Sequence, residues 1–589
     1  MAARERRNRA LEQLESFRRR VPHVSASALS AVLTEAKRQG IPELTSRADV
    51  QEARDVTMQQ KTPYGELYKS VDLDHVKAGQ PKVRLNYVNP FALLSVLLAT
   101  CVGFSSFFEQ VLLEKPSTAE QPWSLVLYSD EVTPGNQLAI ANDRKIQVVY
   151  WSFLEFGSAL SDENLWFTIS AKRSSQVHDI LGGMANLLGA LLKVLFVYEA
   201  FELTGIRFKL ASGRSVRLFA KLACFVQDGG AHKITWHCKG DSGHRFCMLC
   251  RNVVSMGSQL ADVDTDGNVF CNIIKIDDLD FATDDDLIGS VQRLHACRLT
   301  DGADDFEDRQ IACGFTYMGY SLMTDPELDG VVRPATQFLH DWMHCIFASG
   351  IWNIVLQFTF KALQDARRPD VYPLVNTLLQ HWHWPVRMRQ TKLHEMFTMA
   401  RRGTNNEAKR FKCQASEGLS LYAVLAVILG CFTECPHEFM VYLLLCDLID
   451  CFVAVSRGGS VDPSLLKDRV HAFLQAFCSV YGYEFMTPKF HWLLHFPKHL
   501  EEFKMLIACF VHERKHKMVK RYANDVLNTT VFEFSVLSEV LRNPFLRNPF
   551  SLTLWLWSAQ TRSAQFGFVR SWLAQPSSAM FGPSSLQLF

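Results

Sequence analysis

The sequence has almost no net charge and no strong compositional bias. Its 62 lysines and arginines are balanced by 61 aspartates and glutamates. Any affinity for nucleic acid must therefore come from local patches and not from overall charge. Charged residues make up 21% and hydrophobic residues 48% of the chain, which argues against large-scale disorder. At 589 residues, the chain can hold several domains and a sizeable core.

The sequence also lacks a long apolar run free of polar interruption. Three stretches come nearest, at 91–108, 180–201 and 419–455. The first is barely long enough and contains serine and threonine, and the other two contain charged residues that are costly at membrane depth. We therefore expect three buried helices and no membrane partner, with a membrane protein as the less favoured alternative.

A secretory signal pattern is not evident at the N-terminus, although the chain contains 16 cysteines. This combination favours a reducing compartment over a disulfide scaffold. Close cysteine pairs are then more naturally metal ligands, and the pair Cys247 and Cys250 is the clearest case. Cys238 or His244 could complete a local site. A redox role is weaker, because the pair has apolar neighbours and no helix start follows to lower a thiol pKa.

Pattern and composition divide the chain into six regions. Residues 1–72 form a polar, helix-prone arm whose first part carries seven arginines against three glutamates, either as a solvated helix face or as a nucleic-acid-contacting or nuclear-import arm. Residues 73–122 form a helical lead-in. The remaining regions are an α/β core at 123–300, a helical region at 301–500, a helix at 501–540 and a tail without an assigned role at 541–589.

Within the core, short β-branched and aromatic runs predict several strands around one helix at 175–201. They predict an open mixed sheet flanked by helices. The expected strands cover 124–129, 146–153, 165–170 and 216–227.

Two of these strands end in a carboxylate. Asp130 follows the strand at 124–129, and Asp228 follows the strand at 216–227. A lone Asp at a strand end is usually turn chemistry. Two strands of one sheet that both end this way can bring their carboxylates side by side, as a pair of divalent cations requires.

A third acidic residue, Glu513, lies within a strongly basic and helical pattern. By composition alone, this is a solvated cationic helix face in which Glu513 is an ordinary ion-pair partner. The basic residues are Arg514, Lys515, Lys517, Lys520 and Arg521.

Several motifs together resemble the catalytic region of eukaryotic cut-and-paste transposases, most closely the Kyakuja-Dileera-Zisupton class and more distantly the CACTA type. They are DEVTPGN at 130–136, KGDSGHRFCMLCRN at 239–252, DWMH at 341–344, PKFHWLLHFP at 488–497, and the Glu-Arg pair at 513–514 with Lys520.

The resemblance implies a ribonuclease-H-like mixed-sheet core with a large all-helical insertion. It assigns Asp130, Asp228 and Glu513 as a catalytic triad that binds two Mg²⁺ or Mn²⁺ ions, with Glu501 and Glu502 as substitutes for Glu513. The family often has Asn-Gly two residues after Glu-Arg, where this chain has His516 and Lys517. The resemblance also implies a structural Zn²⁺ whose ligands are Cys247, Cys250, Asp341 and His344.

The function implied is a nuclear, transposon-encoded or transposon-derived DNA transposase. It would hydrolyse phosphodiesters and transfer strands with metal assistance, with DNA and a homo-oligomer as partners. The basic helix 514–521 would contact the DNA backbone. The alternative is a catalytically inactive, domesticated DNA-binding or scaffold protein that keeps the fold. His491, His495 and His499 have helical spacing that could suggest a metal, but Pro497 interrupts it and favours core or interface histidines.

Overall fold

The computed structural model describes residues 2–20, 26–43, 46, 48–49, 52, 61–134, 144–240, 243–254, 269–270, 274–366, 370–385, 388, 392–525 and 531–546. Gly135 and Asn136 of the first motif, and the tail after Leu546, lie outside these residues. The chain forms two compact units, Met1–Gln60 and Lys61–Phe589. The first contains helices α1 (Ala2–Arg20) and α2 (Ala26–Gln39).

A five-stranded mixed sheet organises the second unit, and its order is β13-β10-β5-β6-β7. The strands β5, β6 and β7 are antiparallel neighbours, whereas β10 runs parallel to both β5 and β13. The strand bounds are β5 Trp123–Val132, β6 Ile146–Phe153, β7 Phe167–Arg173, β10 Ala220–Gln227 and β13 Phe338–His340. The mixed α/β core predicted from the sequence is therefore confirmed.

The strand β13 lies in a stretch where the sequence predicted only helices. It has three residues and pairs with β10 through Phe338, Leu339 and His340. The sheet thus draws a strand from inside the range 301–500. The boundary expected at residue 72 likewise falls inside a strand, β3 (Tyr68–Leu73), which pairs with β4 (Val83–Val88).

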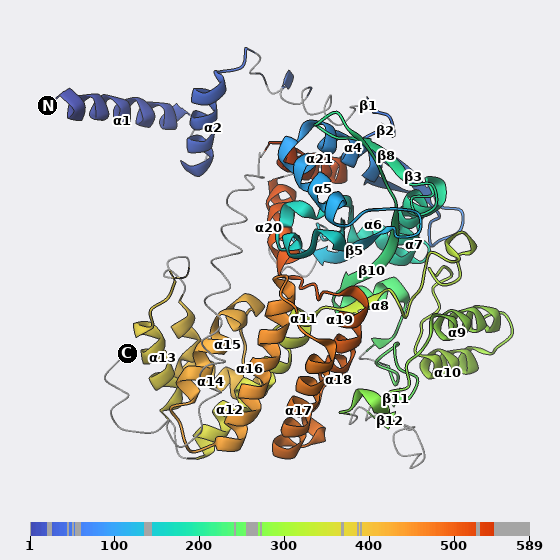
Figure 1. The fold of residues 1–589 in the computed structure, drawn as a ribbon, viewed down its shortest axis with the longest axis vertical. Helices are drawn as coiled ribbons and strands as arrows, with labels where there is room; N and C mark the ends of the chain where they lie inside the picture. Colours follow the sequence, from blue (N-terminus) through green and yellow to red (C-terminus); the bar gives the residue numbers. More distant parts are fainter. Residues whose placement is uncertain are drawn as a thin grey trace. The chain divides into compact units, whose positions relative to one another are not determined.

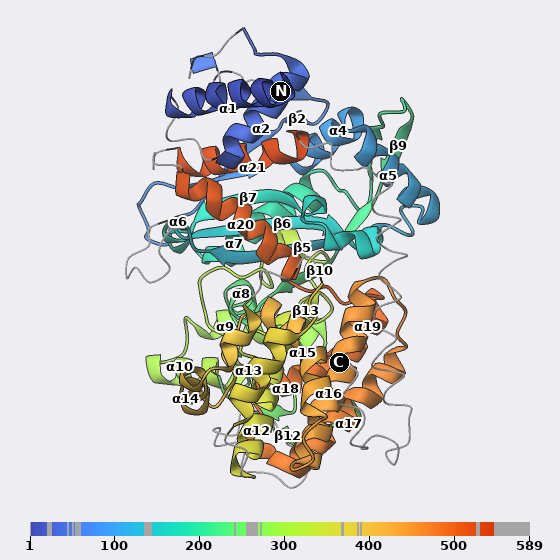
Figure 2. The same ribbon diagram turned by 90° about the vertical axis from the view of Figure 1, so that its left-hand side faces the viewer.

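Two C-terminal helices lie across the strands, as Figure 2 shows. Helix α20 (Phe510–Asp525) contacts β5, and α21 (Phe532–Leu546) contacts β7. A partly buried ion pair fixes α21, because Arg173 Nε lies 2.7 Å from Glu533 Oε1. The chain therefore returns to the sheet after the helical region.

Smaller elements connect and flank the sheet. The helix predicted at 175–201 is broken, because Gly182 and Gly183 have φ of 78° and 55°. Its pieces are α6 Ser174–His178, α7 Gly183–Leu192 and a π-helix Lys193–Tyr198. Other elements are β8 Ile206–Lys209, β9 Ser215–Leu218, α8 Gly229–Trp236, β11 Val253–Val254, β12 Val269–Phe270, α9 Asp284–Cys297 and α10 Ala303–Cys313.

A large helical part, drawn in yellow and orange in Figure 1, contains the segments between β13 and α20. Helix α16 packs against α12, α15 and α17, which bury about half of its apolar window. The bounds are α11 Trp342–Ile346, α12 Ile351–Asp365, α13 Val371–His381, α14 Met399–Ala408, α15 Ala415–Leu429, α16 Pro436–Ser456, α17 Pro463–Tyr481, α18 Pro488–Trp492 and α19 Phe496–Phe503.

The apolar stretches form helices packed within the fold. The first becomes α4 (Pro90–Thr100) and α5 (Val102–Glu114), which meet at a bend of 105°. By length and composition, two described segments could cross a membrane, Trp342–Asp365 and α16, or three if the bent pair is counted. In the structure, 72% and 56% of their apolar windows are buried. The absence of a membrane partner stays a prediction.

Candidate metal centres at the carboxyl edge of the sheet

The parallel strands β5, β10 and β13 each bring an aspartate to the same edge of the sheet. Asp130 lies inside β5, which continues to Val132 beyond the end expected at residue 129, whereas Asp228 and Asp341 directly follow β10 and β13. The register pairs Tyr128 with Val226 and Gln227 with His340. Asp130 and Asp228 each lie two positions beyond the first pair, and Asp341 follows His340 directly. We call this line of Asp130, Asp228 and Asp341 the carboxyl edge.

Asp130 is held in place by two hydrogen bonds. The Tyr128 hydroxyl donates to Oδ2 at 2.9 Å, and the Glu131 amide donates to Oδ1 at 2.7 Å. Burial raises the pKa of Asp130 to about 7, and the nearby Asp228 carboxylate contributes to the rise. The Asp130 carboxyl group therefore resists ionisation next to the Asp228 carboxylate. A bound cation would stabilise the ionised form of Asp130.

Helix α20 is docked on the sheet by stacking. The His512 ring stacks on Tyr128 with centroids 3.7 Å apart and meets the Trp166 ring edge-on at 4.1 Å. This contact fixes the rotation of the helix and turns its next residues toward Asp130. One oxygen each of Asp130 and Glu513 and one ring nitrogen of His516 lie within 4.8 Å of one another.

The structure therefore brings the predicted Glu513 to Asp130 from far along the chain. The substitutes Glu501 and Glu502 are exposed on α19 and do not belong to this group of ligand atoms. His516 was not expected there. Its Nδ1 lies 3.8 Å from Asp130 Oδ2, and burial lowers the pKa of His516 to about 3, so that the ring is a neutral nitrogen donor.

Asp228 caps helix α8, because its Oδ1 accepts a hydrogen bond from the Ala231 amide at 2.6 Å. It is outside the group that Asp130, Glu513 and His516 form. Its charge nevertheless acts on Asp130, as the register of β5 and β10 requires. Of the three expected carboxylates, Asp130 and Asp228 thus belong to the carboxyl edge, and Glu513 lies beside Asp130 on α20.

Asp341 and His344 form a buried ion pair instead of joining the cysteines. Asp341 accepts backbone hydrogen bonds from Met343, His344 and Cys509 at 2.9–3.1 Å, and its carboxylate contacts the His344 ring. Although burial opposes charging, Asp341 raises the pKa of His344 to about 9, and Asp228 and Asp130 add to the effect. His344 is therefore a cation beside the carboxyl edge at neutral pH.

Cys247 and Cys250 meet two histidines, His491 and His495, and we call these four residues the Cys–His tetrad. All four are buried, and their ligand atoms lie within 4.8 Å of one another. The S–N distances are 3.4, 3.5 and 3.6 Å, and the two Nε2 atoms are 3.0 Å apart. Tetrahedral zinc bond lengths give S–N edges of about 3.5 Å and an N–N edge of about 3.3 Å. The tetrad thus fits such an ion.

Burial and the neighbouring Cys247 raise the pKa of Cys250 well above its ordinary value, so a bound cation would be needed to stabilise thiolates at both cysteine positions of the tetrad. Burial opposes ionisation of Cys247, but Cys250 and the two imidazoles hold its pKa well below the ordinary value. Burial lowers the pKa of His495 to about 4, which keeps the ring neutral and able to bind metal.

The ligand set expected from the sequence is therefore corrected. Asp341 and His344 are replaced by His491 and His495 as partners of the cysteine pair, and neither Cys238 nor His244 belongs to the tetrad. The signal in the sequence was the His-x-x-x-His spacing, which together with Cys-x-x-Cys is typical of zinc.

The basic segment of α20 divides between the interior and the surface. Lys515 is only 4% exposed, donates to the Glu163 carbonyl at 3.0 Å and lies over the Tyr150 ring. Burial lowers the pKa of Lys515 to about 8. Arg514 donates to the Ser161 carbonyl at 2.6 Å. The prediction that Lys515 contacts DNA is therefore wrong, whereas Lys517 and Arg521 are exposed.

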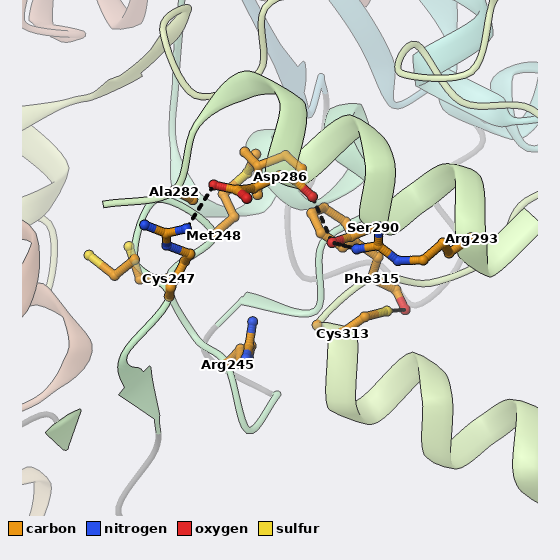
Figure 3. Close-up of a pocket in the computed structure, with 13 residues that line it drawn as sticks. Arg245, Cys247, Met248, Ala282, Asp286, Ser290, Arg293, Cys313 and Phe315 are labelled. Atoms are coloured by element: carbon orange, nitrogen blue, oxygen red, sulfur yellow. Dashed lines mark hydrogen bonds and ion pairs between the residues drawn. The ribbon is translucent and has the colours of Figure 1, made fainter. Parts of the chain in front are cut away.

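A cavity of about 200 Å³ lies against α9, beside residues 243–252, which contain Cys247 and Cys250 and which we call the cysteine loop. In Figure 3, Asp286 lies at the top of the cavity, Arg245 below it, Arg293 at the right and Cys247 at the left. Arg251 is matched by Asp280 at 2.7 Å and by Asp286 at 3.5 Å. The pair with Asp286 attaches the loop to α9, whose N-terminus is capped by the Thr283 side chain.

Comparison with protein-family models and with curated proteins finds no match for the chain.

Proposed function

We propose that the chain is a metal-dependent DNA-cleaving and strand-transferring enzyme of the transposase type, similar to the Kyakuja-Dileera-Zisupton class. One observation carries the proposal: Asp130, near the end of β5, and Asp228, directly after the neighbouring parallel strand β10, lie at the same edge of the sheet, and α20 returns Glu513 to Asp130. Such a convergence of carboxylates suits divalent cations. The mixed sheet is compatible with a ribonuclease-H-like core, and the helices between β13 and α20 with an insertion.

In this proposal each residue has a task that its environment supports. Asp130 is oriented by Tyr128, and Glu513 is oriented by the stacking of α20 on β5. Bound Mg²⁺ or Mn²⁺ would supply the charge that activates the attacking hydroxyl and stabilises the leaving 3′-oxygen. His344 places a further positive charge beside the phosphate that these carboxylates would face.

We assign a structural Zn²⁺ to the Cys–His tetrad. The fit of its S–N distances to a tetrahedral ion supports this assignment. The ion would join the loop after Asp228 to α18 and the turn that follows it. It would thereby hold the helical part against the carboxyl edge.

Nicking of supercoiled plasmid in Mn²⁺ tests the proposal. We expect the wild-type protein to nick DNA and the Asp130→Asn and Asp228→Asn variants to lose nicking by at least 100-fold while retaining DNA binding. A matched control is Asp72→Asn, which alters an exposed pair with Arg84. Equal nicking by wild type and both variants would refute the assignment.

Absence of nicking by wild type, with DNA binding intact, would favour the non-catalytic alternative. That outcome would leave a DNA-binding or scaffold protein with a preserved fold.

A further inference from the structure

A second cavity, of about 410 Å³, opens directly beside Asp228. It lies between the N-terminus of α8, the cysteine loop and α18. Its lining includes Asp228, His232, His344, Lys489 and Trp492. A cavity that joins a candidate catalytic carboxylate to cations and an aromatic ring has the elements of a nucleotide site.

Lys489 supplies a fixed cation in this cavity. Its Nζ donates to the carbonyls of His344 at 2.9 Å and Ala348 at 2.7 Å. An ammonium group has three N–H donors, so two carbonyls fix its position and leave one donor for another acceptor. Neither of these acceptors is a carboxylate, so they do not neutralise its charge.

Trp492 supplies an aromatic surface next to the same carboxylate. A Cβ at Gly229 would lie 3.2 Å from Cη2 of Trp492, so the indole reaches the residue that follows Asp228. The indole also stacks on His340 with centroids 5.1 Å apart, which fixes its plane. An unpaired base near this ring would bring its phosphate near Asp228.

His232 adds a buried polar atom to the lining. The residue is 2% exposed, and its Nε2 lies 3.2 Å from the Leu339 carbonyl. Within the described part of the chain, its Nδ1 has no hydrogen-bond partner. With Nε2 as donor to this carbonyl, Nδ1 is the acceptor nitrogen of the ring.

We infer that this cavity binds one unpaired nucleotide of the DNA strand, with its phosphate at Lys489 and His344 and its base against Trp492. Enzymes that act inside a duplex commonly extrude a nucleotide into such a pocket. The inference rests on the proposed function only in taking DNA as the substrate.

The test measures binding of a single-stranded oligonucleotide that contains 2-aminopurine, using the full chain without added divalent cations. Base stacking contributes about 1–3 kcal/mol, so Trp492→Leu should weaken binding roughly 5-fold to 150-fold and abolish quenching of 2-aminopurine. Trp492→Phe should restore most of both signals. Trp382→Ala, a half-exposed tryptophan elsewhere in the helical part, should change neither.

A second variant, Lys489→Met, tests the phosphate end. Loss of one phosphate contact should make the plot of log affinity against log salt concentration less steep, by about 0.7 in the magnitude of its slope. If both Trp492→Leu and Lys489→Met bind the oligonucleotide and quench 2-aminopurine as the wild-type protein does, the subsite is refuted. Nicking by the wild-type protein would then still support the proposed function. The expected changes in a protein that does not nick would support the subsite and count against the proposed function.

Discussion

Removal of the ion assigned to the Cys–His tetrad should destabilise the fold by a calculable amount. Cys250 and His491 are 241 positions apart and lie 3.5 Å from each other through Sγ and Nε2. A metal that holds both closes a very long loop and so restricts the unfolded chain. The loop-closure relation used for cross-links gives about 5 kcal/mol for a loop of this length.

This loss converts into a shift of the melting temperature. Unfolding entropy is about 2.1 cal/mol/K per residue, or roughly 1 kcal/mol/K for the unit Lys61–Phe589. The melting temperature should therefore fall by about 5 °C when the metal is removed. Cys250→Ser should cause a similar fall without chelator.

The assay is calorimetry of the protein before and after dialysis against a zinc chelator, combined with metal analysis. Cys431→Ser is the matched control, because Cys431 is exposed and outside the tetrad. We expect one zinc per chain, lost in Cys250→Ser and retained in Cys431→Ser. A purified protein that contains no zinc, and whose melting temperature does not change with chelator, would refute the assignment of a structural Zn²⁺ to the Cys–His tetrad.

Three further outcomes are expected. Because burial raises the pKa of Asp130 to about 7, protons compete with metal for this carboxylate. The Mn²⁺ affinity measured by calorimetry should therefore fall about tenfold per pH unit below pH 7. An Mn²⁺ affinity that does not change with pH would contradict this. Burial lowers the pKa of His237 in the folded protein to about 4, whereas a histidine in the unfolded chain has a pKa of about 6.5. As the pH falls below about 6.5, the unfolded chain therefore binds a proton at this position before the folded protein does. The free energy of unfolding should drop by up to about 3 kcal/mol by pH 4. His237→Asn should flatten this fall in urea unfolding, whereas replacing the exposed His178 should not. Arg173→Met leaves Glu533 unpaired and 5% exposed, and should cost about 3 kcal/mol by the same assay; a loss below about 1 kcal/mol would show that the pair does not hold α21.

The sequence predicted the elements that carry the first two carboxylates because their local patterns were strong. The β-branched and aromatic runs before Asp130 and Asp228 became β5 and β10. The parallel pairing of β10 with β5, which sets the two aspartates side by side, depends on contacts across about 100 residues and has no local signal.

The misread residues show where local pattern is insufficient. The strand β13 has only three residues and runs directly into a helical pattern, so its pairing with β10 decides its structure. His491 and His495 were set aside because of Pro497, but that proline lies in the first turn of α19, after both ligands. Lys515 stands in a run of basic residues of the kind usually found at the surface. It is buried because α20 packs on β5.

The most direct measurement of the central claim is anomalous X-ray scattering from crystals soaked in Mn²⁺. We expect manganese peaks in contact with the carboxylates of Asp130, Asp228 and Glu513, and we expect these peaks to be lost in Asp130→Asn. Peaks elsewhere only, or none at millimolar Mn²⁺, would contradict the claim that the carboxyl edge is a catalytic metal centre.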